Sequence, residues 1–183
     1  MKSIFSYFKR KLKKNRPAYF IDSNESLRIL DEELSKSELL GIDTEFDWRT
    51  TYFPKLSLIQ ISSEKSLFLI DCLKVNPKII LKKYLENKNI LKIFHSVRSD
   101  TTVLSKCLRC LTNNVFDIQV ADKILHKGEI LSYGKIVKKF FNIDLKKTET
   151  NSNWLKRPLT DNQINYALDD VDFLIEIYNF QRR

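Results

Sequence analysis

Glycine is scarce in this sequence of 183 residues, which contains only Gly41, Gly128 and Gly134. Three glycines at these spacings exclude both the glycine-rich phosphate-binding loop and the G-x-G-x-x-G dinucleotide fingerprint. Long apolar runs are also absent: no stretch approaches the roughly 18 apolar residues of a membrane-spanning helix, so no transmembrane segment is expected. The length and the 43% hydrophobic content suit one globular domain with a sizeable core.

Cysteine is also scarce, with three residues in the sequence. Cys72, Cys107 and Cys110 are too few, and odd in number, for a disulfide framework. The last two have the spacing of a zinc knuckle, but no second pair follows, and their helical surroundings favour a small buried hydrophobic side chain at Cys107. The N-terminus lacks the apolar segment of a secretory signal. We therefore expect a cytoplasmic protein without a zinc site at these cysteines.

The basic charge is concentrated at one end of the chain. The net charge is +9, and residues 1–20 carry seven basic and no acidic side chains, whereas the rest is almost neutral. We interpret residues 1–19 as a basic N-terminal arm and residues 20–183 as the folded domain. The arm has the composition of a segment that binds phosphate backbones or, as an amphipathic helix, an anionic membrane surface. A solvated tail and an organellar targeting segment are the alternatives.

Hydrophobic periodicity predicts an α/β domain built around a mixed sheet. Two of the expected strands form a hairpin, and one is buried on both faces. The expected strands are 39–46, 55–62, 66–71 and 89–96, and the expected helices are 23–37, 77–87, 99–111, 118–127, 132–141 and a single final helix over 160–178.

Two carboxylates one residue apart stand out in the stretch GIDTEFDW, residues 41–48. Side chains alternate along a strand, so Asp43 and Glu45 share one face, and Ile42 lies on the other. Like charges a few ångströms apart repel each other, and burying them unpaired is costly. A divalent cation that prefers oxygen ligands would neutralise them. The alternative is a strand end that emerges into water.

The final helix brings a phenol and another carboxylate together. Thr160 and Gln163 have the spacing of a capping box, which places the helix start near residue 161. Tyr166 and Asp170 are four residues apart, so they share a face, which is turned away from the apolar stripe. This face either lines a cleft or is merely exposed. Asp100 follows the strand 89–96 and is either a further site residue or a helix N-cap.

These residues, in this order, resemble the ribonuclease D family of 3′→5′ exonucleases, in the branch with a tyrosine in the third motif. The stretch DTEF, with Asp43 and Glu45, is similar to the first motif of the family, D-x-E. The stretch IFHSVRSDTTVL, with Asp100, is similar to the second motif. The stretch YALDDV, with Tyr166 and Asp170, is similar to the third motif, Y-x-x-x-D. The flanking segments TTYFPKLSLIQIS and NWLKRPLT also resemble the family. The resemblance covers residues 20–180.

The resemblance implies a ribonuclease H-like mixed β-sheet flanked by helices, with the Asp43 strand central and the last helix crossing it. It also implies two divalent metal ions, Mg²⁺ or Mn²⁺, held by Asp43, Glu45, Asp100 and Asp170. In this arrangement Asp43 bridges the two ions, and Tyr166 positions the attacking water. The implied activity is metal-dependent hydrolysis of RNA from a single-stranded 3′ end to nucleoside 5′-monophosphates, in RNA 3′-end trimming or decay.

Residues around these motifs are candidates for substrate contacts. Thr44 and Phe46 adjoin the acidic strand, and Phe46 either stacks on a base or packs in the core. His95 either contacts the terminal nucleotide or satisfies a backbone group. Lys147 and Arg157, in the late loop, are predicted phosphate contacts, whereas Trp154 is expected to pack.

Two departures from the family pattern bear on the function. Thr101 and Thr102 stand where the family carries an apolar residue and often an acid. The C-terminal helical domains of longer ribonuclease D proteins have no counterpart in these residues, which leaves their substrate, precursor transfer RNA, open. The alternatives are an exonuclease for short oligonucleotides or DNA, and a non-catalytic nucleic-acid-binding module.

Overall fold

The computed structural model describes residues 16–48, 52–146 and 148–183. Its strands are β1 Ala18–Ile21, β2 Leu39–Asp47, β3 Lys55–Ser62, β4 Leu67–Asp71, β5 Leu91–Phe94 and β6 Val115–Asp117. Its helices are α1 Asn24–Leu34, α2 Lys78–Leu85, α3 Arg98–Leu108, α4 Ile118–His126, α5 Tyr133–Phe141, α6 Asp161–Asp172 and α7 Leu174–Gln181. None of these helices is long and apolar enough to cross a membrane.

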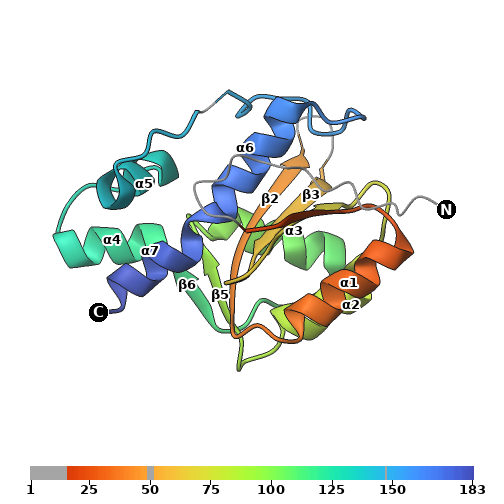
Figure 1. The fold of residues 1–183 in the computed structure, drawn as a ribbon, viewed down its shortest axis with the longest axis horizontal. Helices are drawn as coiled ribbons and strands as arrows, with labels where there is room; N and C mark the ends of the chain where they lie inside the picture. The colour runs from red at the N-terminus through yellow and green to blue at the C-terminus, as the bar shows by residue number, and fades with distance from the viewer. Residues whose placement is uncertain (1–15, 49–51, 147) are drawn as a thin grey trace.

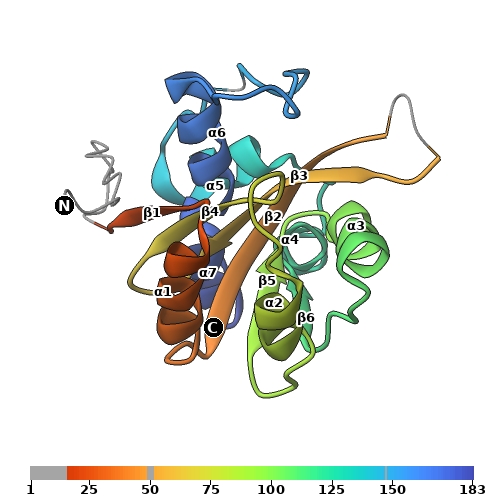
Figure 2. The same ribbon diagram turned by 90° about the vertical axis from the view of Figure 1, so that its right-hand side faces the viewer.

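The six strands form one mixed sheet (Figure 1), and their order across it is β1-β4-β3-β2-β5-β6 (Figure 2). β2 pairs antiparallel with β3 and parallel with β5, and the predicted β3–β4 hairpin is present. Helices α1, α2 and α3 bury their apolar sides in a core on one face of the sheet, and α4 to α7 pack on the other (Figure 2). The predicted α/β fold with a central acidic strand is therefore confirmed.

A close approach of backbone elements explains the glycine at position 41. A Cβ atom there would lie 2.3 Å from Ser62 Oγ and 2.9 Å from Leu174 Cβ. Only glycine leaves room for the first turn of α7 to pack directly on β2. The same packing brings the preceding helix, α6, over the strand that carries the acidic pair.

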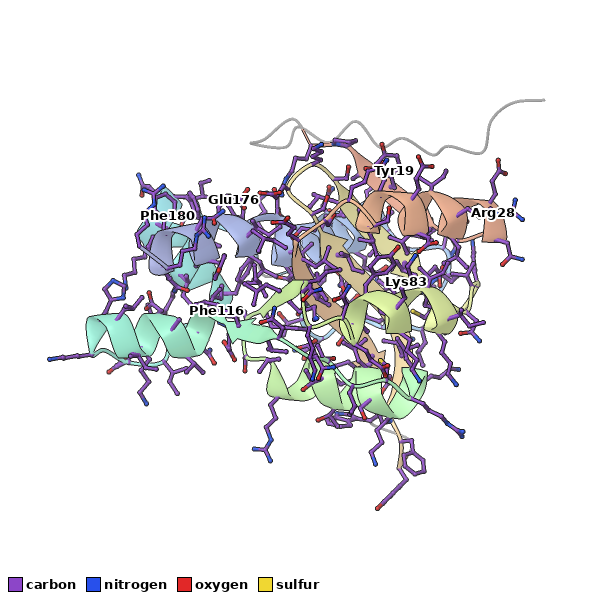
Figure 3. The ribbon with its side chains drawn as sticks, turned by 90° about the horizontal axis from the view of Figure 1, so that it is seen from below. Tyr19, Arg28, Lys83, Phe116, Glu176 and Phe180 are labelled. Atoms are coloured by element: carbon purple, nitrogen blue, oxygen red, sulfur yellow. The ribbon has the colours of Figure 1, made fainter. Side chains whose placement is uncertain are left out.

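The boundary predicted for the basic arm is wrong by a few residues. β1 begins at Ala18 and pairs in parallel with β4, so the sheet starts inside the expected arm. Arg16 is buried and donates hydrogen bonds to Ser63 O and to both the carbonyl and the carboxylate of Asp172. Glu176, labelled in Figure 3, lies 3.7 Å from the same guanidinium. Residues 1–15 of the arm, like Lys147, lie outside the described residues.

The single final helix that was predicted is two helices. The capping box of Thr160 and Gln163 is confirmed at the start of α6. The helix is interrupted at Phe173, whose φ of −112° and ψ of −1° are not those of a continuous α-helix. The apolar stripe continues through the break, because α6 and α7 pack on the same face of the sheet. Hydrophobic periodicity alone therefore gave no sign of the interruption.

Candidate active site

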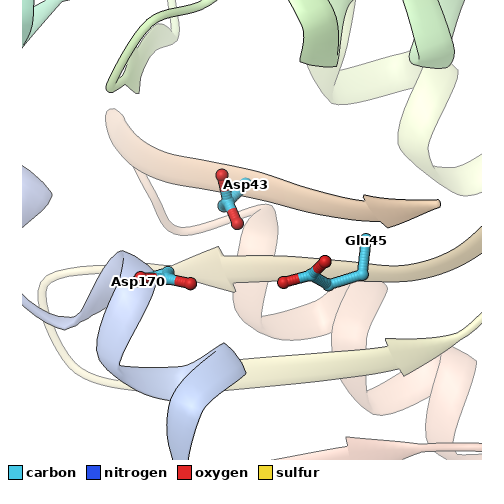
Figure 4. A group of neighbouring side chains, drawn as sticks. All are labelled: Asp43, Glu45 and Asp170. Carbon is cyan, nitrogen blue, oxygen red and sulfur yellow. The ribbon is translucent and has the colours of Figure 1, made fainter. Parts of the chain in front are cut away.

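Three carboxylates converge between the sheet and α6. Asp43 and Glu45 come from β2, and Asp170 comes from α6 (Figure 4). One oxygen from each of the three lies within 4.8 Å of the others. Ile42, on the opposite face of the strand, belongs to the other core, as the predicted alternation requires. The structure thus brings together the strand pair and the helix acid that lie far apart in the sequence.

The electrostatics of this cluster are unfavourable without a cation. Burial raises the pKa of Asp43 well above its ordinary value, and the neighbouring charges of Asp100 and Asp170 add to the shift. Burial, followed by Asp170 and Asp100, raises the pKa of Glu45 to about 9. No lysine or arginine in the described part of the chain forms an ion pair with Asp43 or Glu45. Oxygen-only donors in such a field fit Mg²⁺ or Mn²⁺.

Asp100 lies beside the cluster in the first turn of α3. It is buried, and its Oδ1 accepts a hydrogen bond of 2.6 Å from Thr44 Oγ1. Burial raises its pKa to about 6, although the hydrogen bond from Thr44 opposes the shift. Asp100 is not an N-cap: Asp117 accepts hydrogen bonds from the N–H groups of Ser96 and Val97 where α3 begins. The capping alternative for Asp100 is therefore wrong.

The three acids open into a pocket of about 240 Å³. Its other lining residues come from the position after β5, the start of α5, the loop after α5 and α6: His95, Ser132, Tyr133, Gly134, Leu145, Lys146, Tyr166 and Asp169. Burial and the charge of Asp170 raise the pKa of Tyr166 to about 12, so its hydroxyl stays protonated at neutral pH. Trp154 is buried with its ring 6.0 Å from that of Tyr166, which confirms the packing role expected for it.

His95 contacts a backbone group, as one of its two predicted alternatives requires, and it also lines the pocket. Its Nε2 lies 3.1 Å from Leu131 O and 3.2 Å from Gln119 Nε2, so the ring is held by the protein. The ring also packs edge-on against Tyr133 and lines the pocket. A protein contact fixes the imidazole while one side of it faces the site.

The other candidates for substrate contact have different surroundings. The hydroxyl of Thr44 is engaged by Asp100, which argues against a contact with a nucleotide. Phe46 packs against the core and edge-on against Trp48, with ring centroids 5.4 Å apart. Arg157 makes a bidentate pair with Asp71 and lines a separate pocket, so its predicted phosphate contact has no support in the geometry.

Lys146 and Tyr133 are among the lining residues that the sequence did not predict. Lys146 is adjacent to the predicted Lys147, and the spacing gave no reason to prefer one over the other. Tyr133 begins α5 in the stretch LSYG, where nothing in the local pattern separates a site residue from a core residue. Only the tertiary fold places both beside the acids.

Comparison with known proteins agrees with this geometry. A family model described as 3′-5′ exonuclease matches residues 19–182. Ribonuclease D of Desulfotalea psychrophila is 35% identical over 155 residues, which cover 84% of this chain and 41% of that protein. The crystal structure of Escherichia coli RNase D, described as an exoribonuclease involved in structured RNA processing, matches with a TM-score of 0.85 and 29% identity over 90% of this chain and 44% of that one.

A structure of Trypanosoma brucei RNase D in complex with RNA U12 shares the fold, with a TM-score of 0.81 and 22% identity over 91% of this chain and 63% of that one. The chain belongs to the 3′-5′ exonuclease family. The resemblance to ribonuclease D and the ribonuclease H-like fold that it implied are thereby confirmed. The chain spans about two fifths of the length of the curated relatives that it matches.

Proposed function

We propose that this chain is a metal-dependent 3′→5′ exoribonuclease that hydrolyses the terminal phosphodiester of RNA and releases nucleoside 5′-monophosphates. The convergence of the carboxylates of Asp43, Glu45 and Asp170 within 4.8 Å carries this proposal. Among the described residues, no lysine or arginine forms an ion pair with Asp43 or Glu45. A structural role would require a cationic partner, because uncompensated buried acids are costly.

The donor set fits the two divalent ions expected for this family. Asp43, Glu45 and Asp170 would hold one ion, and Asp43 with Asp100 would hold the second. Bound there, Mg²⁺ or Mn²⁺ supplies stabilisation of the charge that develops on the attacking and leaving oxygens. The pKa values of Asp43, Glu45 and Asp100 are raised, chiefly by burial, so the folded chain disfavours their ionised forms, and a nearby cation would offset this.

The chain's own residues orient the reactants. Tyr166 keeps its proton, so its hydroxyl orients the attacking water by hydrogen bonding and does not act as a general base. Lys146, which lines the same pocket, offers an ammonium group to a phosphate. His95, fixed by Leu131 O, faces the terminal nucleotide. A pocket of about 240 Å³ suits one terminal nucleotide, which favours removal of residues from an end.

RNA is the proposed substrate because the relatives include an RNase D described as an exoribonuclease and one crystallised with RNA. The small pocket keeps short oligonucleotides as a second candidate. DNA and a binding module without catalysis are further outcomes that the following experiment separates.

The test is incubation with 5′-labelled RNA and DNA of several lengths in Mg²⁺, Mn²⁺ or EDTA. We expect RNA to shorten one nucleotide at a time from the 3′ end, with nucleoside 5′-monophosphates as products, and EDTA to stop the reaction. Asp170→Asn should abolish cleavage, whereas Asp161→Asn, an exposed acid in the first turn of the same helix, should not. Binding without cleavage in either metal would contradict the proposal.

A further inference from the structure

The break between α6 and α7 contains an inserted side chain. In a continuous helix the Phe173 N–H would donate to the carbonyl of Asp169, four residues earlier. Here the Phe173 N–H donates to the hydroxyl of Tyr133 at 3.1 Å, and that hydroxyl donates to the Asp169 carbonyl at 3.1 Å. Tyr133 Oη therefore occupies the place of one helical hydrogen bond. A side chain inserted into the hydrogen-bond ladder is a recognised cause of a helix kink.

Tyr133 approaches this break from another helix. It is the first residue of α5, it is buried, and its ring lies 5.7 Å from that of His95. Its ring also lines the pocket that contains Asp43 and Asp170. The hydroxyl is directed at the backbone of α6 and α7, where it has one donor and one acceptor. The phenol therefore serves the helix backbone and takes no proton from a substrate.

Asp170 is the next residue after Asp169, whose carbonyl accepts the hydrogen bond from the Tyr133 hydroxyl. Its carboxylate lies within 4.8 Å of two other acids, so the position of its backbone helps to set the geometry of the cluster, and a restraint on that backbone bears on the site. The bond from Tyr133 to Asp169 O supplies one, because it fixes the peptide unit that joins Asp169 to Asp170. A second restraint acts at the last residue of α6, where Arg16 donates to the Asp172 carbonyl.

We propose that Tyr133 is a positioning residue, whose hydroxyl, inserted in the α6–α7 break, sets the last turn of α6 and thereby the place of the Asp170 carboxylate. This inference rests on the proposed function, in which Asp170 is a metal ligand. Groups that orient metal ligands typically affect metal affinity or activity by 10- to 100-fold. An effect of about 10-fold is expected for Tyr133, because it acts through the backbone.

The test compares Tyr133→Phe with Tyr84→Phe. Tyr84 is a matched control: it is a buried tyrosine on the other face of the sheet, and its hydroxyl also donates to a backbone carbonyl, that of Asp31. Three quantities are measured for each variant: the affinity of the metal-free protein for Mn²⁺ by calorimetry, kcat and KM separately, and the ¹³C chemical shift of the Asp170 carboxyl. Hydrogen exchange at the Phe173 amide reports on the break itself.

In Tyr133→Phe we expect Mn²⁺ affinity and kcat to fall about 10-fold with KM within twofold, the Asp170 signal to move, and the Phe173 amide to exchange faster. Tyr84→Phe should change none of these. An unmoved Asp170 signal with Mn²⁺ affinity within twofold of the parent would overturn the inference. If the parent protein binds no Mn²⁺, the proposed function fails, and the Asp170 signal and the Phe173 amide alone decide the role of Tyr133.

Discussion

This molecule contains two acidic sites with opposite surroundings, one buried and one half-buried. Asp71, at the end of β4, is fully buried and receives Arg157 Nε at 2.6 Å and Nη2 at 2.8 Å. The same guanidinium donates to Trp154 O and to Ser57 Oγ, so the pair is saturated. Asp43 and Glu45 lie on β2, two strands away, and face other acids.

The contrast between these two sites distinguishes a structural ion pair from a binding site. A buried ion pair with complete hydrogen bonding holds a loop in place, and breaking it leaves a charge without compensation. A cluster of like charges raises the free energy of the folded state, and folding tolerates it where a ligand relieves it. The fold supplies a guanidinium for Asp71, whereas Asp43 has no such ion pair among the described residues. This difference supports the proposal that a divalent cation neutralises the second site.

The largest expected effect concerns the acidic cluster. Asp43→Asn should lower the rate of RNA hydrolysis by at least about 1,000-fold, as expected for loss of an essential catalytic group. The stability of the metal-free variant should stay unchanged or rise, because one repelling charge is removed. Single-turnover assays and urea unfolding in EDTA measure the two effects. Turnover close to that of the parent protein in Mg²⁺ would contradict the metal-site assignment.

The opposite effect on stability is expected at the ion pair of Asp71 and Arg157. Arg157→Met should reduce the free energy of unfolding by about 3 kcal/mol or more, because Asp71 would remain buried without its partner. Lys138→Met is a suitable control, since it removes an exposed pair with Asp144 and should cost under about 1 kcal/mol. Urea titrations at constant pH measure both. Equal small losses for the two variants would show that the buried pair is no more important than the exposed one.

Within the acidic site, Tyr166→Phe tests the phenol separately from the carboxylates. We expect Mn²⁺ affinity to be retained and the single-turnover rate to fall roughly 10- to 1,000-fold, as for other positioned catalytic groups. The ring should still pack against Trp154, so stability should change little. A rate equal to that of the parent protein would remove Tyr166 from the mechanism.

The pH dependence of stability provides a further test of the acidic cluster. The pKa of Glu45 rises from its ordinary value of 4.5 to about 9, so between these values the folded chain binds more protons than the unfolded chain. The free energy of unfolding of the metal-free protein should therefore decrease as pH rises through this window. Thermal unfolding in EDTA from pH 5 to 8.5 checks this, and Mg²⁺ should restore the lost stability at the upper end. If thermal stability does not change with pH over this range, folding does not raise the pKa of Glu45.

The acidic site was predictable from sequence because its information is local. Strand alternation places Asp43 and Glu45 on one face, and the four-residue spacing places Tyr166 with Asp170. The family resemblance added that these residues occur in the order of the three family motifs. The break at Phe173 was not predictable, because the group that interrupts the helix is a hydroxyl 40 residues earlier in the chain.

The remaining errors have the same physical origin. The pairing of Asp71 with Arg157 spans 86 residues and carries no spacing signal, so the arginine was taken for a phosphate contact. Arg16 looked like one more charge of a basic arm, although a partner far along the chain buries it. β6 has only three residues, too few to establish an alternation.

The contact between Arg16 and Asp172 also has a consequence for the order of folding. It closes a separation of 156 residues, and Asp172 lies two positions after the acid that completes the cluster. Contacts between residues so distant in sequence form late, because much of the chain entropy must be lost before they gain anything. We therefore expect the acidic site to be among the last parts of the molecule to assemble, so that in partly folded chains the acids would still lie apart.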